Sequence, residues 1–157
     1  MIFLGLGSNL SSSYGDRFEN INLALSHLES SGVQILKRSS FYESPSYPNK
    51  LNPKFINIVA SVQTKLSLDD LMSVLLLVEE KLERKRNEKN DPRTCDIDII
   101  DFNGQVLNFK YKNEDFNIPH IKINYRTFVL FPLKEIFPEW KHPKTNEKID
   151  ITRYVKF

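Results

Sequence analysis

The sequence predicts an α+β fold in which helices pack on a mainly antiparallel sheet. Apolar residues make up 40% of the 157 residues and charged residues 27%, the balance of a globular domain. Some segments alternate apolar and polar residues, as strands do, and others repeat apolar residues every three or four positions, as helices do. Their order is strand, helix, strand, strand, helix, strand, which matches a ferredoxin-like split βαβ core with C-terminal additions. We therefore expect an αβα sandwich that forms a single domain over residues 1–157.

The first half of the chain supplies three elements and a long loop. Residues 2–6 are a short apolar strand that ends at Gly7-Ser8-Asn9. A helix is expected over residues 16–30, followed by Gly32, because glycine commonly ends helices. Residues 33–42 have the pattern of the next strand. Residues 44–53 contain three prolines and two asparagines, which excludes a paired strand and predicts a loop.

The second half continues with residues 55–64, which alternate as a strand. Ser67 is placed to cap a helix that runs to about residue 84, with Asp70 at the reciprocal capping position. Residues 97–102 form the next strand. Because Asn103-Gly104 is typical of a tight hairpin turn, residues 105–109 are expected to pair with that strand. A short helix is expected near residues 126–136.

Charge and cysteine content exclude several classes of protein. The formal net charge of +2 is too small to indicate nucleic-acid binding on bulk charge alone. Cys95 is the only cysteine, so no intramolecular disulfide can form, which fits a reducing compartment. The first residues lack the features of a signal peptide, and no apolar run approaches the length of a membrane span. We therefore expect a cytoplasmic monomer with no membrane or nucleic-acid partner.

Asp96 and Asp98 are the strongest chemical feature. Alternate residues of a strand share a face and lie about 6–7 Å apart, so both carboxylates should project together while Ile97 and Ile99 enter the core. Two carboxylates on a rigid strand can hold Mg²⁺, with phosphate oxygens completing the coordination. A chance repeat on an exposed polar face would give the same pattern, although aspartate is depleted in strands.

Basic residues surround this pair in the sequence. Arg84 and Arg86 precede the adjacent loop, and Arg93 lies three residues before Asp96. Guanidinium groups beside a dicarboxylate suit a triphosphate, because they bind phosphate oxygens in forked hydrogen bonds. A solvated helix end would also explain these charges. No P-loop or Rossmann glycine pattern is present, so side chains would have to hold a nucleotide.

Other candidate residues have structural alternatives. Glu79 lies on the apolar side of its helix, where it could point toward the nucleotide or extend from the edge of the core. Phe55 and Asn57 share a strand face and could stack on and hydrogen-bond a flat heterocycle, or be a core ring and a surface amide. A lone histidine such as His120 is more often structural than catalytic.

Ordered motifs along nearly the whole chain resemble the hydroxymethyl-dihydropterin pyrophosphokinase family. In order, they are Gly7-Ser8-Asn9-Leu10, Ser39-Ser40-Phe41-Tyr42-x-Ser44-Pro45, Phe55-Ile56-Asn57, Glu79 with Arg84-x-Arg86, Pro92-Arg93-x-x-Asp96-x-Asp98-Ile99, Ile118-Pro119-His120, and Arg126-x-Phe128 with Pro132-Leu133. The resemblance implies transfer of pyrophosphate from ATP to 6-hydroxymethyl-7,8-dihydropterin, with release of AMP, in tetrahydrofolate biosynthesis.

The resemblance also implies roles for individual residues. Asp96 and Asp98 would bind two Mg²⁺ ions that arrive with ATP. The implied catalytic set is Asp96, Asp98, Arg84 and Arg93. The implied ATP ligands are Glu79, Arg84, Arg86, Arg93, His120 and Arg126. The implied pterin ligands are Ser44, Pro45, Phe55, Asn57 and Phe128.

The sequence departs from the family pattern just before Pro92-Arg93, where an aromatic residue is usual. Here the stretch is Lys89-Asn90-Asp91. Two other functions use similar residues: a ferredoxin-like module that binds single-stranded nucleic acid, and a metal-dependent nuclease. Formation of AMP from ATP only when a hydroxymethyl-pterin is present would separate the pyrophosphokinase from both.

Overall fold

The computed structural model describes residues 1–46, 49–85 and 90–149. Its main sheet contains β1 (Ile2–Ser8), β2 (Gln34–Arg38), β4 (Phe55–Gln63) and β5 (Asp96–Phe102), in the order β2-β4-β1-β5. The short β3 (Tyr42–Ser44) also pairs with β4. Each of these pairs is antiparallel, and the order is that of a split βαβ core. The predicted α+β fold class is therefore confirmed.

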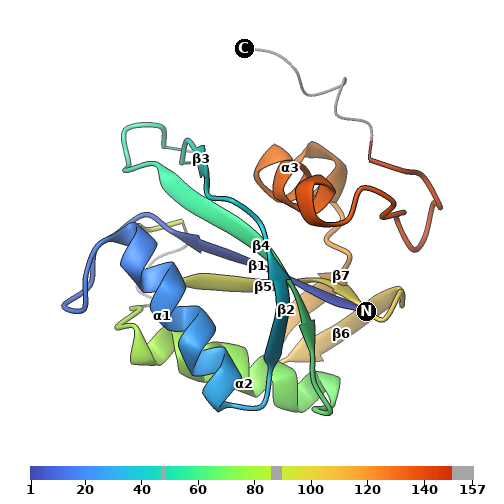
Figure 1. Ribbon diagram of the computed structural model, residues 1–157, viewed down its shortest axis with the longest axis horizontal. Coiled ribbons are helices and arrows are strands. Elements are labelled where there is room, and N and C mark those ends of the chain that lie inside the picture. Colours follow the sequence, from blue (N-terminus) through green and yellow to red (C-terminus); the bar gives the residue numbers. More distant parts are fainter. Residues whose placement is uncertain (47–48, 86–89, 150–157) are drawn as a thin grey trace.

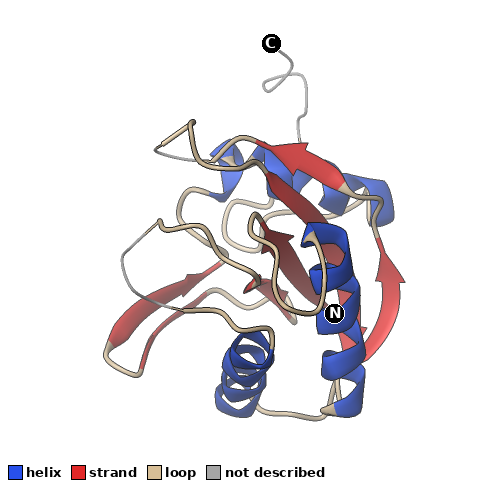
Figure 2. Ribbon diagram, turned by 90° about the vertical axis from the view of Figure 1, so that its left-hand side faces the viewer, coloured by secondary structure: helices blue, strands red, loops and turns tan. Residues whose placement is uncertain are grey.

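The sheet separates two apolar cores. Figures 1 and 2 show helices on both faces of the sheet. Helices α1 (Arg17–Ser30) and α2 (Leu68–Lys81) cover one face, and α3 (Thr127–Ile136), preceded by the 3-10 turn Ile123–Tyr125, covers part of the other. Leu4 and Leu6 of β1 enter the first core, whereas Phe3 enters the second, because successive strand residues point to opposite faces. None of the helices in the described part of the chain is long and apolar enough to cross a membrane.

Side-chain caps form at the start of both α1 and α2. The Asp16 side chain accepts a hydrogen bond from Glu19 N while the Glu19 side chain accepts from Asp16 N, a complete capping box. Ser67 accepts from Asp70 N at the start of α2. The second helix ends at Lys81, before the expected residue 84. Gly32 has φ of +91°, which favours glycine after α1.

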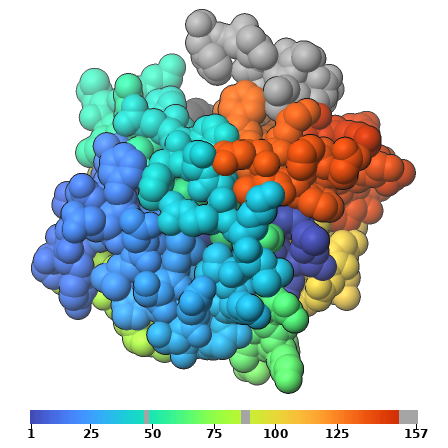
Figure 3. Space-filling view, in the orientation of Figure 1, coloured from blue at the N-terminus to red at the C-terminus, as the bar shows by residue number. Residues whose placement is uncertain are grey.

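The strand expected over residues 33–42 is interrupted by Ser39. Its N–H donates to Val59 O at 2.8 Å, and its hydroxyl accepts from Val59 N at 3.0 Å. A side-chain oxygen thus takes the place that a strand carbonyl would occupy, so β2 ends at Arg38 and β3 begins at Tyr42. Figure 3 shows this segment lying between α1 and α3 on one side of the molecule.

The predicted pairing of residues 105–109 with the preceding strand is wrong. The Asn103-Gly104 turn forms, but β6 (Leu107–Tyr111) pairs with β7 (Glu114–Ile118) as a separate two-stranded sheet. A second turn, with positive φ at Lys112 and Asn113, closes this hairpin. Its rings pack against the first core, and the Tyr111 hydroxyl lies 2.7 Å from Ser73 Oγ on α2. The hairpin thus packs against the first core and contacts α2 without its first strand pairing with β5.

Candidate active site

Asp96 and Asp98 lie on the sheet face that α3 covers only in part. Ile97 and Ile99 enter the core under α1 and α2, so the two alternating aspartates face the other way. Successive rows across β4, β1 and β5 on that face are Ser61-Phe3-Asp101, Val59-Gly5-Asp98 and Asn57-Gly7-Asp96. Phe3 and Val59 pack in the α3 core. The face thus changes from apolar packing to polar residues and glycines toward the Asn57 end.

Two arginines converge on Asp96. Arg84 Nη1 lies 3.2 Å from Asp96 Oδ1, and Arg93 Nη1 lies 3.3 Å from Asp96 Oδ2. The side chains of Arg84 and Arg93 are 10% and 19% exposed, which places both guanidiniums close to the surface with little freedom. Together they form a positive rim around one of the two carboxylates.

Glu79 contacts Arg84 and the start of β5 from the interior of the protein. Its Oε2 atom accepts from Ile97 N at 2.8 Å and lies 2.8 Å from Arg84 Nη1. The residue is 3% exposed, so the carboxylate faces the protein interior and not the solvent. The end of α2 is thereby joined to the start of β5, and Arg84 is oriented toward Asp96. Sequence analysis left open whether Glu79 faces a nucleotide, and this geometry favours an indirect role.

Asp98 is exposed, in contrast to its neighbours on β5. The residue is exposed by surface area, but many protein atoms surround its carboxyl, and this desolvation raises the carboxyl pKa to about 7, with the negative charges of Asp96 and Glu79 contributing to the rise. Arg126 and Arg84 oppose that rise. Since the residue surface is open to solvent, a cation can reach the carboxyl, and a positive charge there would favour its ionised form.

The donor chemistry of this pair fits magnesium only with further ligands. Carboxylate oxygens are the hard donors that Mg²⁺ prefers. The described residues contain no group of three or more His, Cys, Asp or Glu side chains arranged for a metal. A magnesium ion held by Asp96 and Asp98 would therefore need oxygens from water or phosphate, which is how Mg²⁺ commonly binds with nucleotides.

His120 and Arg126 form a second cluster of donors. The His120 Nδ1 atom accepts from Lys122 N at 3.0 Å, so the neutral ring carries its proton on Nε2. Burial lowers the pKa of His120, and the charges of Arg126 and Lys122 lower it further, which favours that neutral ring. Arg126 Nη2 lies 3.2 Å from Nε2. Two donors thus face one another, and an anion oxygen could accept from both.

Asn57 and Ser44 are adjacent on β4 and β3. The amide nitrogen of Asn57 donates to Tyr42 O at 3.2 Å and to Ser44 Oγ at 2.9 Å. Both amide hydrogens are used in this way, so Oδ1 is the atom left to accept a hydrogen bond. Phe55 lies two residues earlier on the same face, with the Arg93 guanidinium 5.8 Å from its ring centre. The structure gives Pro45 no polar contact of its own that would define its role.

Phe128 is the second residue of α3 and is 37% exposed. The Arg126 guanidinium lies 5.8 Å from its ring centre. Glu135 lies two helical turns later on the same side of α3 and accepts from Ser40 N and from the Tyr42 hydroxyl at 2.7 Å. This contact fixes the face of α3 that carries Phe128 against the segment that carries Ser44. Arg86 lies outside the described residues.

Gly5, Gly7 and Asn9 had no predicted individual role, although Gly7 and Asn9 belong to the Gly7-Ser8-Asn9-Leu10 motif. A Cβ at Gly7 would lie 3.1 Å from Asn57 Oδ1 and 3.5 Å from Phe55 Cδ1, so the absent side chain lets Asn57 and Phe55 approach the backbone closely in the row that ends at Asp96. Two glycines within an apolar central strand were the available signal, because strand glycines often mark close approach of a ligand. Asn9 is only 2% exposed and bonds to three separate segments.

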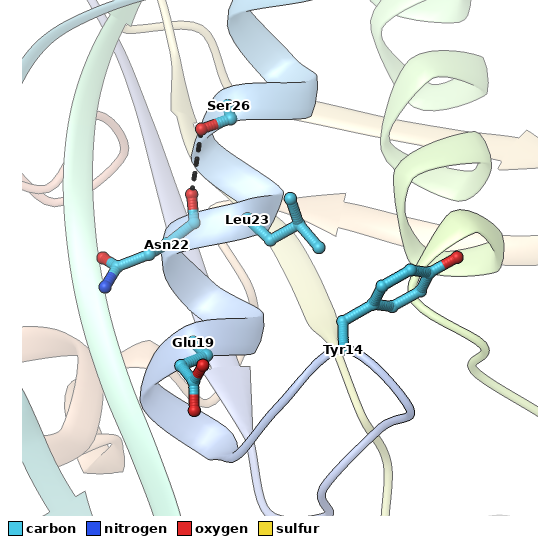
Figure 4. A pocket seen from close by; sticks show the side chains of 5 residues that line it. All are labelled: Tyr14, Glu19, Asn22, Leu23 and Ser26. Carbon is cyan, nitrogen blue, oxygen red and sulfur yellow. Dashed lines mark hydrogen bonds between the residues drawn. The ribbon is translucent and has the colours of Figure 1, made fainter.

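Two surface hollows and Cys95 have no place in this site. One hollow of about 340 Å³ lies beside α1 (Figure 4), and another of about 530 Å³ lies near Gly32 and Lys65. Neither is lined by a residue predicted for the site, and the lining of the first includes no cation for a phosphate. Burial raises the pKa of the Cys95 thiol well above its usual value, and the charges of Glu79 and Asp96 add to this, which excludes a reactive thiolate.

Comparison with known proteins identifies relatives of this chain. A family model described as 7,8-dihydro-6-hydroxymethylpterin-pyrophosphokinase matches residues 3–138. A 2-amino-4-hydroxy-6-hydroxymethyldihydropteridine pyrophosphokinase of Synechocystis is 34% identical over 93% of this chain and 71% of that protein. One from Aquifex aeolicus is 34% identical over 90% of this chain and 83% of that protein. The folic acid synthesis protein fol1 of Pneumocystis carinii is 35% identical, but this chain spans only 19% of its length.

A solved structure of similar fold is a Plasmodium falciparum HPPK-DHPS chain. Its TM-score is 0.74 at 17% sequence identity, over 98% of this chain and 44% of that chain. Identity at this level supports the fold alone. The family model and the relatives that are one third identical over most of both chains carry the assignment, and they confirm the resemblance seen in the sequence. The chain belongs to the 7,8-dihydro-6-hydroxymethylpterin-pyrophosphokinase family.

Proposed function

We propose that this chain catalyses the transfer of pyrophosphate from ATP to the hydroxymethyl group of 6-hydroxymethyl-7,8-dihydropterin, with release of AMP, as a step of folate biosynthesis. The observation that carries the proposal is the row Asn57-Gly7-Asp96. It places an amide acceptor and a carboxylate that is paired with two arginines on either side of a glycine, which presents no side chain of its own. The activity is assigned to the single domain expected over residues 1–157.

The reaction requires two substrates to meet between these groups. The hydroxymethyl oxygen attacks the β-phosphorus of ATP, and the bond from that phosphorus to the oxygen bridging to the α-phosphorus breaks. AMP leaves with the bridging oxygen, and the hydroxyl proton is released to solvent. Phosphoryl transfer depends mainly on positioning and charge stabilisation, so the site needs no strong general base.

The triphosphate is assigned to the arginine-rich side. Arg84 and Arg93 now share Asp96, and each has further guanidinium donors to offer to phosphate oxygens. Between His120 Nε2 and Arg126, a phosphate oxygen would accept from two donors that otherwise face each other. Arg86 is assigned to ATP on the family resemblance alone. Glu79 is proposed to act through Arg84, which it orients.

Asp96 and Asp98 are proposed to hold two Mg²⁺ ions that bind together with ATP. When bound, these ions would screen the charge of the triphosphate and of the transferred group. The contribution of the chain is to present two carboxylates from one rigid strand, with Asp98 left accessible. Arg84 and Arg93 orient Asp96 through one ion pair to each of its carboxylate oxygens.

The pterin is assigned to the other side of Gly7. Asn57 Oδ1 would accept from an edge N–H of the heterocycle, and Ser44 and Pro45 would line that edge. The rings of Phe55 and Phe128 would cover the two faces of the pterin, since flat heterocycles stack well on aromatic rings. Neither a nucleic-acid-binding module nor a nuclease finds support among the relatives, which are named for folate synthesis.

The test is AMP formation from ATP with and without 6-hydroxymethyl-7,8-dihydropterin, in the wild type and in Asp98→Ala. We expect pterin-dependent AMP formation by the wild type and loss of turnover by at least ~10³-fold in Asp98→Ala, in line with removal of a group that stabilises transition-state charge. The circular dichroism spectrum should be unchanged, because Asp98 is exposed. Asp69→Ala, at an exposed position of α2, is the matched control and should keep full activity. Substantial turnover by Asp98→Ala in Mg²⁺ would refute the metal role.

A further inference from the structure

We propose that Asn9 is a positioning residue that joins the pterin side of the site to the triphosphate side. The inference rests on the proposed function and adds a residue that acts through its neighbours. Asn9 follows the last residue of β1 and is 2% exposed. Because it is buried next to both halves of the site, it can transmit a displacement of one half to the other.

The Asn9 side chain uses all of its polar groups in contacts with distant segments. Its Oδ1 atom accepts from Arg93 N at 2.7 Å. Its amide nitrogen donates to Ser46 Oγ at 3.0 Å and to Pro53 O at 3.1 Å. Its backbone N–H also donates to Arg93 O at 3.0 Å. One buried amide therefore connects β1, the segment before β5 and both ends of the loop between β3 and β4.

Each partner of Asn9 is close to a residue assigned to a substrate. Arg93 holds Asp96 with its guanidinium, which is on the triphosphate side. Ser46 comes two residues after Ser44, which bonds to Asn57. Pro53 comes two residues before Phe55, which is the first residue of β4. The hydroxyl of Ser46 donates to Pro53 O at 2.6 Å, which closes the loop ends on Asn9. The separation of the two substrates thus depends on this amide.

Asn9→Asp should break the contacts of residue 9 with the pterin side and keep its contact with the triphosphate side. A carboxylate oxygen can still accept from Arg93 N, so the triphosphate side keeps its contact. The other oxygen cannot donate, and it would face the Pro53 carbonyl oxygen, which repels it. The change therefore releases the loop between β3 and β4 while leaving Arg93 in place. We expect a loss of coupling between substrates and not a general loss of binding.

The experiment is calorimetry on the full chain with 6-hydroxymethylpterin and Mg²⁺–α,β-methylene-ATP. The readout is the ratio of the pterin dissociation constants measured without and with the nucleotide analogue. In the wild type we expect a ratio of at least about fivefold, the lower end of typical coupling between sites. In Asn9→Asp the ratio should fall to within about twofold of unity, with nucleotide affinity kept within about threefold and kcat reduced about tenfold or more.

Asn20→Asp is the matched control. Asn20 is also fully buried, with its amide donating to Leu10 O at 3.0 Å and accepting from Ser12 Oγ at 2.6 Å, but its partners lie within residues 8–20. It should lower the melting temperature and leave the ratio unchanged. An equal loss of coupling in Asn20→Asp, or an unchanged ratio and kcat in folded Asn9→Asp, overturns the proposal.

If Asn9→Asp does not fold, Ser46→Ala decides. This variant removes one partner of the Asn9 amide and keeps both contacts with Arg93, so the ratio should fall by about two- to threefold, and an unchanged ratio overturns the proposal. Failure of the proposed function would appear elsewhere, as a wild type that forms no pterin-dependent AMP.

Discussion

Gly7→Ala tests whether the space between Asn57 and Asp96 is where the pterin meets the triphosphate. The backbone at Gly7 is outside the left-handed region, so alanine can adopt it. The added Cβ would lie 3.1 Å from Asn57 Oδ1, roughly 0.4 Å closer than an optimal contact of about 3.5 Å. Asn57 must therefore move, although its amide is held by Tyr42 and Ser44.

The magnitude follows from this displacement. A misplacement of 1 Å costs about 100-fold in rate, so a shift of a few tenths of an ångström, with one hydrogen bond weakened, should cost about 5- to 20-fold in kcat/KM for the pterin. This corresponds to about 1–2 kcal/mol. The lower chain entropy of alanine in the unfolded state, about 0.4–1 kcal/mol, offsets part of the strain, so the melting temperature should change by only a few degrees.

The assay is steady-state AMP formation with the pterin varied at saturating ATP, with calorimetric nucleotide affinity measured beside it. Gly32→Ala is the control: its Cβ would meet nothing within 4 Å, but its φ of +91° strains an alanine. That variant should lose stability and keep its kinetics. A folded Gly7→Ala enzyme with wild-type kcat/KM for the pterin would show that this space is not used by the substrate.

Two further predictions concern the groups that hold the site together. Glu79→Gln should lower the free energy of unfolding by about 2–3 kcal/mol, or the melting temperature by about 4–12 °C, because Arg84 and Ile97 N lose a buried carboxylate partner. Glu80→Gln, at the adjacent exposed position, is the control and should leave the melting temperature unchanged. Equal melting curves for the two variants would contradict this prediction. Burial, then the hydrogen bond to Glu135 and its charge, raises the pKa of Tyr42 to about 12. The protonated Tyr42 hydroxyl therefore contributes its full stabilisation below pH 10, its ordinary pKa, and this contribution is lost as the pH rises through about 12. The difference in tyrosinate absorbance between the wild type and Tyr42→Phe should have its titration midpoint near pH 12. In Glu135→Gln this midpoint should move toward pH 10. A midpoint at pH 10 in the wild type would exclude the hydrogen bond between Tyr42 and Glu135.

Several features of the fold could be predicted from local patterns. The alternation of Asp96 and Asp98 with Ile97 and Ile99 correctly indicated which side of β5 enters the core, because strand geometry alone decides that. Asp16 and Ser67 cap their helices through contacts with residues three positions away. Such signals depend on neighbours in sequence, so sequence reasoning could evaluate them directly.

Features that depend on distant partners were not predictable in this way. The residues of β6 carry a strand pattern, but they pair with β7 and pack with it against the first core, and this choice depends on residues distant from the Asn103-Gly104 turn. Ser39 interrupts a strand because its hydroxyl meets Val59, twenty residues away. Glu79 was ambiguous because its apolar surroundings gave no sign of Arg84 and Ile97 N as its partners.

The sequence by itself determined the strand and helix order, the family and the identity of the groups that carry charge, because these follow from composition, periodicity and motif spacing. Only the tertiary structure decided how those groups meet. It placed Gly7 between Asn57 and Asp96 in one row of the sheet, and it brought three separate segments into hydrogen-bond contact with Asn9. The physical reason is that a hydrogen bond or an empty volume belongs to a pair of distant residues, and its existence depends on how the whole chain packs.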